Sequence, residues 1–190
     1  VEPARVSDTL RSVVDIFCAA PFLRYAPSAM FCSGGFMALQ SLWAVPWLMH
    51  VAGLGLAESA RYLVWLNLGM LCGQLGIGWF ATRLAHRGIR SLHLLCGGYV
   101  GLLLVEMLIW GQLPGQGAFW FLLGACSAVN AQGYLAAASH FPAAVFSRVS
   151  TSINLMSFAG AFAVQWGLGW ILDVLQGQDW SLPAALKAAL

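Results

Sequence analysis

The sequence contains very little charge. Of its 190 residues, 9 are Lys or Arg and 7 are Asp or Glu, so 8% are charged, whereas soluble domains carry about 25%. A water-soluble globule of this size could not cover its surface with so few charges. A soluble enzyme is therefore excluded, and so is a nucleic-acid-binding protein, because a net charge of +2 provides no basic surface for a polyanion.

The residue patterns that carry chemistry are also missing. The five cysteines, at positions 18, 32, 72, 96 and 126, form no C-x-x-C pair, and their odd number argues against a disulfide framework. The four histidines show no metal-ligand spacing. No phosphate-binding G-x-x-x-x-G-K-[ST] motif and no nucleophile–base pair is visible. We therefore expect no enzymatic activity, no cofactor and no metal site.

Apolar residues dominate instead. Hydrophobic residues make up 60% of the chain and its mean hydropathy is +0.77, which also excludes disorder. A bilayer core about 30 Å thick requires about 20 mostly apolar residues of helix. Five stretches meet this requirement: 29–54, 62–82, 91–113, 117–140 and 152–175. They do not alternate as the strands of a membrane barrel do. The sequence thus predicts an all-α membrane protein with five transmembrane helices.

The positive residues lie mostly on one side of the predicted membrane. That side holds seven of the nine, and the opposite side holds only Arg61 and Lys187. The seven are Arg5, Arg11, Arg24, Arg83, Arg87, Arg90 and Arg148. Because cytoplasmic connectors carry the excess of Lys and Arg, the N-terminus is predicted to be cytoplasmic.

Two regions are predicted along the chain. Residues 1–26 form a cytoplasmic linker, and residues 27–190 form the transmembrane bundle. Within the linker, residues 7–17 are amphipathic, with Leu10, Val13, Val14 and Phe17 on the apolar face. We interpret them as a short helix lying on the membrane surface, with a solvated linker turn as the alternative.

The second and fifth predicted spans resemble each other at an offset of 91 residues. The residues at 69, 74, 76, 78 and 79 (Gly, Gln, Gly, Gly, Trp) recur at 160, 165, 167, 169 and 170. Because the two spans run in opposite directions, the match indicates a three-plus-three inverted repeat, an arrangement typical of secondary transporters. A sixth span is then expected, and residues 182–190 look like its beginning, so we expect the chain to be an excerpt of a longer protein.

The chain resembles the C-terminal half of a major facilitator superfamily (MFS) transporter, with helices seven to eleven present and helix twelve truncated. The resemblance rests on the Gly- and Arg-rich connector 78–90 and on the stretches 141–142, 147–154 and 158–167. Thr82 departs from the family pattern, which has Asp there, and this departure puts a salt-bridge latch at the loop in doubt. The resemblance implies proton-coupled transport of a small solute by alternating access. It further implies a bacterial inner membrane and, as partner, the N-terminal half of the same transporter.

Polar side chains inside the predicted spans are candidates for a solute path. They lie on four spans, and each can either line the path or simply hold helices together by hydrogen bonds. The candidates are Gln40, Trp43, Trp47, Asn67, Gln74, Asn130, Tyr134, Asn154 and Gln165. Gln40, Trp43 and Trp47 follow one another at helical spacing, so we expect them on one face of the first span.

Charged residues supply two further predictions. Glu106 is the one acid well inside a span and is the candidate for proton coupling, although its helix resembles an outer scaffold helix. Arg83, Arg87, Arg90 and Arg148 are candidates for gating at the cytoplasmic side. The alternative to a transporter is a half-size membrane protein that forms an oligomeric pore or scaffold.

Overall fold

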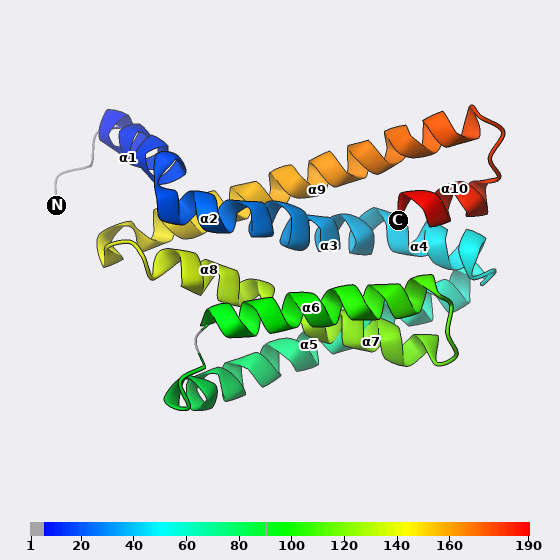
Figure 1. Ribbon diagram of the computed structural model, residues 1–190, viewed down its shortest axis with the longest axis horizontal. Coiled ribbons are helices and arrows are strands. Elements are labelled where there is room, and N and C mark those ends of the chain that lie inside the picture. Colours follow the sequence, from blue (N-terminus) through cyan, green and yellow to red (C-terminus); the bar gives the residue numbers. More distant parts are fainter. Residues whose placement is uncertain (1–5, 90) are drawn as a thin grey trace.

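The described residues, 6–89 and 91–190 of a computed structural model, form helices and no strand (Figure 1). The prediction of an all-α protein is therefore confirmed for this part of the chain. The helices, in chain order, are α1 (Val6–Cys18), α2 (Ala20–Ser28), η1 (Ala29–Ser33), α3 (Gly34–Ala38), η2 (Leu39–Trp43), α4 (Ala44–Pro46), η3 (Trp47–Val51), α5 (Leu56–His86), α6 (Ser91–Trp110), α7 (Gln116–Ser127), α8 (Asn130–Ala138), η4 (Ala143–Val145), α9 (Phe146–Gln176) and α10 (Leu182–Ala189).

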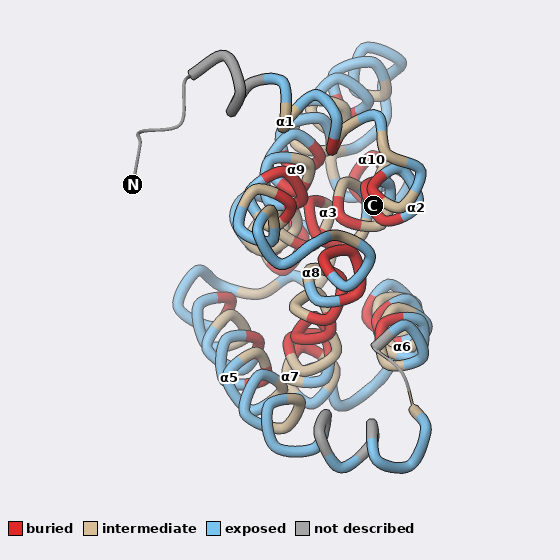
Figure 2. The backbone as a smooth tube through the Cα atoms, turned by 90° about the vertical axis from the view of Figure 1, so that its left-hand side faces the viewer, coloured by how far each residue is buried: buried red, intermediate tan, exposed pale blue. Residues whose placement is uncertain are grey.

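Within the described residues, four helical stretches are long and apolar enough to cross a membrane. They are Leu56–Phe80, Leu92–Trp110, Gln116–Ala138 and Ala143–Gln176, and each overlaps one of the predicted spans. Large apolar side chains point outward from them: Phe162 is 76% exposed, Trp166 74% and Met107 70%. The buried residues lie on the inner sides of the helices (Figure 2). Such a surface suits lipid rather than water, and it indicates an integral membrane protein.

The stretch in which the first span was predicted is helical throughout residues 20–51, but it alternates α segments with π turns. We call it the π-rich helix. It starts at Ala20, with Pro21 in its first turn, and not at residue 29 as predicted. Proline fits there because the first helical N–H groups have no intrahelical partner to lose. Each α or π segment of the π-rich helix is shorter than a membrane span. By length and composition, the π-rich helix is therefore not among the four candidate spans.

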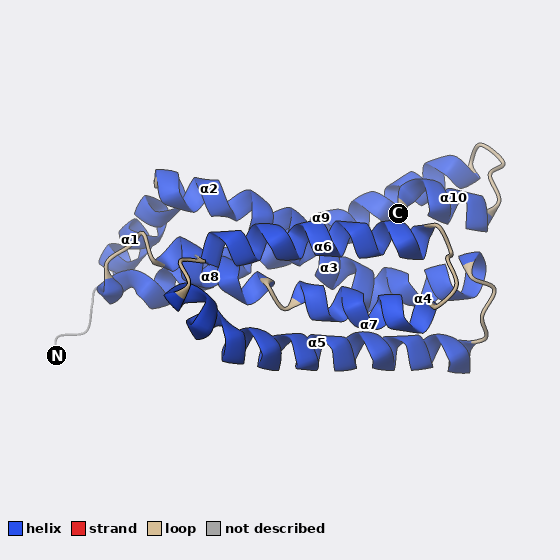
Figure 3. Cartoon of the chain, turned by 60° about the horizontal axis from the view of Figure 1, so that its bottom comes forward, coloured by secondary structure: helices blue, strands red, loops and turns tan. Residues whose placement is uncertain are grey.

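The fourth predicted span is interrupted. α7 ends at Ser127 and α8 begins at Asn130, with a turn at Ala128 and Val129 (Figure 3). There the backbone N–H of Gln132 donates to the carbonyl of Val129 at 2.8 Å, a tighter i→i+3 pattern than in an α-helix. The break places Asn130 at the start of a new helical segment in the middle of the bundle.

Glycines bring α5 and α7 into close contact. A Cβ atom on Gly69 would overlap the carbonyl oxygen of Phe121, and one on Gly73 would lie 2.5 Å from that of Ala125. In the other direction, a Cβ atom on Gly124 would overlap the carbonyl of Leu66. Gly69 and Gly73 form a G-x-x-x-G pair in the sequence, a spacing that predicts close helix packing, and the contact confirms this prediction.

A second close contact joins α9 to the π-rich helix. A Cβ atom on Gly160 would overlap the carbonyl oxygen of Met30, and one on Gly34 would lie 2.6 Å from that of Ser157. α9 therefore packs on the π-rich helix as tightly as α5 packs on α7.

α1 lies against the start of α9. The predicted amphipathic segment 7–17 is helical. Among its residues 11–17, whose side chains are described, Ile16 is the buried one and Val14 is 59% exposed, so the predicted apolar face is only partly correct. The guanidinium of Arg148 donates a hydrogen bond to the hydroxyl of Ser12 at 2.9 Å. The side chain of Leu10 lies outside the described residues. The helix is thus fixed to the bundle by a contact that the sequence pattern did not reveal.

Candidate functional site

A cavity of about 570 Å³ lies between the π-rich helix, α5, α7, α8 and the start of α9. We call it the polar cavity. Four of the nine predicted path residues line it: Gln40, Gln74, Asn130 and Tyr134. The other lining residues are Ser33, Phe36, Met37, Met70, Ser127, Ala131, Leu135, Phe146 and Ser150. The residues of this set that were not predicted include Ser33 and Ser150, which sequence reasoning missed because serine is also common as a packing residue in membrane helices.

Three more predicted path residues form hydrogen bonds beside the polar cavity. The Gln40 amide donates to Asn67 Oδ1 at 3.1 Å, which links the π-rich helix to α5. The Tyr134 hydroxyl donates to Asn154 Oδ1 at 3.0 Å, which links α8 to α9. The Gln165 amide donates to Ser41 Oγ at 2.9 Å, which links α9 to the π-rich helix. Asn67, Asn154 and Gln165 thus connect helices, and two of the side chains that line the cavity, Gln40 and Tyr134, are held in place by these bonds.

Asn130 carries an unused acceptor. Its Oδ1 atom is buried and has no hydrogen-bond partner among the described residues. A buried acceptor without a partner costs about 1–3 kcal/mol. Because Asn130 lines the polar cavity, this acceptor is placed where a bound molecule could satisfy it.

Trp43 and Trp47 do not share a face with Gln40, so that prediction is wrong. Trp43 packs against the cluster of Leu172, Ala185 and Leu186 on α9 and α10, and Trp47 is buried in a different cluster with residues of α5, α6 and α7. The physical reason is the π turn Leu39–Trp43, since a π turn holds more residues than an α turn and changes the angular position of the residues within and after it.

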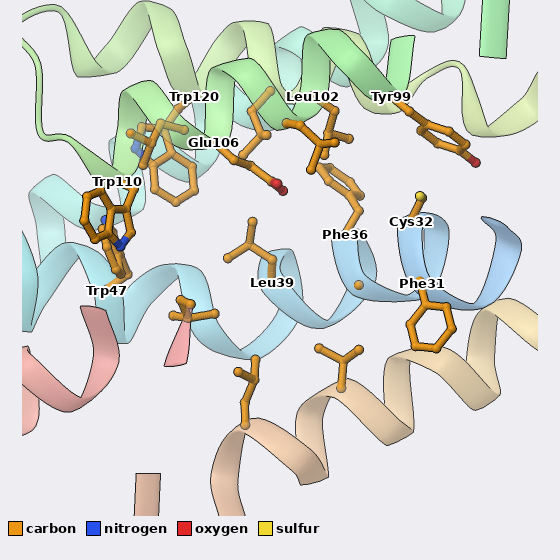
Figure 4. A pocket seen from close by; sticks show the side chains of 17 residues that line it. Phe31, Cys32, Phe36, Leu39, Trp47, Tyr99, Leu102, Glu106, Trp110 and Trp120 are labelled. Atoms are coloured by element: carbon orange, nitrogen blue, oxygen red, sulfur yellow. The ribbon is translucent and has the colours of Figure 1, made fainter. Parts of the chain in front are cut away.

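Glu106 lines a second cavity, of about 390 Å³, which we call the aromatic cavity. Its walls include Phe36, Trp47, Tyr99 and Trp120, and it is bounded by α6, α7, α9 and the π-rich helix. Figure 4 shows the Glu106 carboxylate pointing from α6 into the space beside Leu39. Over residues 6–89 and 91–190, no hydrogen bond or ion pair to this carboxylate is found. The candidate for proton coupling is therefore separate from the polar cavity.

The four arginines predicted to gate have different surroundings. The Arg83 guanidinium lies 4.7 Å from the centre of the Trp79 ring, a cation–π contact within α5. Arg87 is exposed after the end of α5, Arg90 lies outside the described residues, and Arg148 bonds to Ser12. Among the described residues, no ion pair holds Arg83 or Arg148.

The arrangement can bind a small molecule by hydrogen bonds, since the polar cavity combines amides and hydroxyls with apolar walls. In the part of the chain that the structure describes, no group of three or more His, Cys, Asp or Glu side chains is placed to hold a metal ion. Comparison of the chain with protein-family models, curated proteins and solved structures found no match. The interpretation of the site therefore depends on its own geometry.

Proposed function

We propose that this chain forms one helical bundle of a secondary transporter that moves a small solute across a membrane by alternating access. The observation that carries the proposal is the polar cavity, where Gln40, Gln74 and Asn130 from three helical regions converge inside a bundle with an apolar outer surface. Polar side chains in a bilayer are costly unless they meet partners or water, so they mark solute pathways. The cavity volume of about 570 Å³ falls within the range of small-molecule sites, about 300–1,000 Å³.

The proposed bundle counts the π-rich helix as a fifth span. Its 20–51 stretch exceeds the length of about 20 residues that a bilayer requires. With five spans, the ends of α5, α8 and α1 share one side, and Arg11, Arg24, Arg83, Arg87 and Arg148 gather there. That side is proposed to be cytoplasmic, in a bacterial inner membrane.

An inverted repeat of three plus three helices is supported by the two glycine contacts. Gly69 meets Phe121 and Gly160 meets Met30. Adding the sequence offset of 91 to Gly69 gives Gly160, and subtracting it from Phe121 gives Met30. Exchanging the two proposed repeats therefore maps the Gly69–Phe121 contact onto the Gly160–Met30 contact. A two-fold axis in the membrane plane requires this correspondence.

Such a bundle is proposed to be of the MFS type, which the loop and span patterns of the sequence resemble, and to work with the N-terminal half of the same transporter. Two bundles that rock around a shared site would expose the polar cavity to each side in turn. Glu106 is the proposed proton carrier. Glu106→Gln keeps the side-chain shape and removes the exchangeable charge, so loss of pH-driven uptake with intact expression would support coupling, and normal uptake would make Glu106 structural.

Cysteine accessibility tests the solute path without knowledge of the solute. In a variant in which the five native cysteines are replaced by alanine, we would compare Gln74→Cys with Leu75→Cys. Gln74 lines the polar cavity, and Leu75, the next residue, is 67% exposed on the apolar surface. A charged, membrane-impermeant thiosulfonate should modify Gln74→Cys about tenfold faster, because only a hydrated thiol ionises readily.

The vesicle orientation separates the proposed mechanism from its alternative. Modification of Gln74→Cys in both right-side-out and inside-out vesicles, without ion leak, is expected for alternating access. Modification accompanied by ion leak would instead indicate an open oligomeric pore. Equal, slow modification of both variants would indicate a scaffold and would contradict the transporter proposal.

A further inference from the structure

We propose that the solute is a neutral polyhydroxyl compound, such as a sugar or polyol, that binds in the polar cavity by donating hydrogen bonds to oxygens of Ser127, Asn130 and Tyr134. This inference rests on the proposed function and specifies the chemical class of its solute. Two observations support it. Hydrogen-bond acceptors in the cavity wall remain unused, and the described residues of the wall carry no charged side chain.

The first unused capacity is that of Asn130 Oδ1, which is buried and lacks a donor among the described residues. An acceptor in this state remains costly until a donor reaches it. Asn130 lines the polar cavity, so a solute in the cavity is placed to supply that donor. The acceptor therefore selects for a molecule with an O–H or N–H group.

Two hydroxyl groups add acceptors of the same kind. Ser127 Oγ already donates to the carbonyl of Gly124 at 2.7 Å, and Tyr134 Oη already donates to Asn154 Oδ1 at 3.0 Å. Each hydroxyl has a single proton, so both oxygens retain only lone pairs for a ligand. Together with Asn130, they give the cavity at least three acceptors, and a solute with several hydroxyl groups can satisfy more than one at once.

The lack of charged side chains in the cavity wall disfavours ionic solutes in this half of the site. None of the described residues that line the polar cavity is Asp, Glu, Lys, Arg or His. A charged solute would lose water without gaining a counter-charge, which is strongly unfavourable in an apolar environment. The rest of the wall, including Phe36, Met70 and Phe146, is apolar and suits the C–H faces of a sugar.

The experiment measures protection of a reporter thiol. In the full chain with its native cysteines replaced by alanine, Ser150→Cys places a thiol in the cavity wall, and Ser147→Cys places one on an exposed position of the same helix as a matched control. Three probes of similar size are compared: glucose is neutral, gluconate is anionic and glucosamine is cationic. The pH is mildly acidic, so that the amine of glucosamine stays charged. The rate of fluorescein-maleimide labelling is the readout.

Glucose is expected to slow labelling of Ser150→Cys in a saturable way and to leave Ser147→Cys unaffected. Adding Asn130→Leu should raise the half-protecting glucose concentration about tenfold, because one hydrogen bond to a buried acceptor is lost. Adding the isosteric Asn130→Asp should allow glucosamine to protect, since the wall then carries a negative charge. Retention of size-exclusion behaviour by both variants separates binding from misfolding.

Three results would overturn the inference. If gluconate or glucosamine protects the unsubstituted cavity as well as glucose does, the solute class is wrong while a solute site, and hence the proposed function, stands. If glucose protects equally with and without Asn130→Leu, the acceptor assignment is wrong. If no probe protects, the cavity is not a polyhydroxyl site, and the vesicle experiment with Gln74→Cys decides separately whether a solute path exists.

Discussion

Glu106 and Asn130 are both polar residues within the bundle, yet their surroundings differ. Asn130 lies beside hydroxyls and amides, whereas Glu106 lies among aromatic side chains. A carboxyl group in such surroundings loses water and gains no donor from the residues described around it. The two cavities therefore have different chemistry although Phe36 borders both of them.

This difference predicts that Glu106 lowers the stability of the bundle. Glu106→Leu should raise the free energy of unfolding by about 1–3 kcal/mol, because it replaces a poorly solvated polar group by an apolar one of similar size. Thermal unfolding of the purified protein in detergent measures the effect. Glu106→Gln, which keeps the shape and a polar group, serves as the control and should gain less. A loss of stability in Glu106→Leu would mean that the carboxylate has a stabilising partner.

At the scale of helices, backbone contact at glycine holds α5 to α7 and α9 to the π-rich helix. Such contacts depend on the absence of a side chain and not on any attractive group. The glycines at each contact therefore set how closely the two helices can approach.

Gly69→Ala is expected to destabilise the bundle by about 1–3 kcal/mol, because its Cβ atom would meet the rigid carbonyl of Phe121 and force α5 away from α7. Gly76→Ala is the matched control on the same helix, since no atom of a neighbouring element lies within 4 Å of the place that its Cβ atom would take. That substitution should be neutral or stabilising by about 0.5–1 kcal/mol, as expected for glycine inside a helix. Equal effects of the two substitutions on thermal unfolding would show that the contact contributes nothing.

α1 supplies a second prediction at this scale. Ser12→Ala removes the acceptor of the Arg148 hydrogen bond, one of the interactions that hold α1 on α9. Since a bond to a charged group contributes about 1.5–3 kcal/mol, amide hydrogen exchange in α1 should become at least about tenfold faster. Ser147→Ala, an exposed change next to Arg148, should leave the exchange rates unaltered. Unchanged exchange in Ser12→Ala would mean that apolar contacts alone fix α1.

For the whole molecule, the distribution of arginine predicts the orientation in the membrane. A reporter that is active only in the cytoplasm should be active when it is fused in the α5–α6 connector, after His86, or between α8 and α9. A reporter that is active only on the opposite side should be active when it is fused between η3 and α5 or between α6 and α7. Replacing Arg83 and Arg87 by Gln should weaken this preference, because those residues contribute to the positive excess. The reverse pattern of reporter activity would contradict the orientation.

The sequence predicted more of the bundle than of its site. Runs of about 20 apolar residues identified the four helical stretches that are long and apolar enough to cross a membrane, because a bilayer imposes that length on any helix that spans it. It also predicted the role of Gly69 and Gly73. The predicted face shared by Gln40, Trp43 and Trp47 was wrong, because the π turn Leu39–Trp43 has no compositional signal in the sequence. Ser33 and Ser150 were missed, since only tertiary packing brings them to the polar cavity.

The π turns also mean that the π-rich helix carries residues beyond those an α-helix with the same number of turns would need. Deleting Ser41, within the turn Leu39–Trp43, should convert that turn to α geometry at little cost in backbone hydrogen bonds. Residues beyond it would then keep their orientation, because the π turn already accommodates the surplus residue that the deletion removes. Trp47 would stay in its buried position, and Gln40 would keep its place. If the turn instead became α without a deletion, everything beyond it would rotate by about 100° around the helix axis. The surplus residue thus gives this segment a second possible register, in which one end of the helix changes partners while the other end stays fixed.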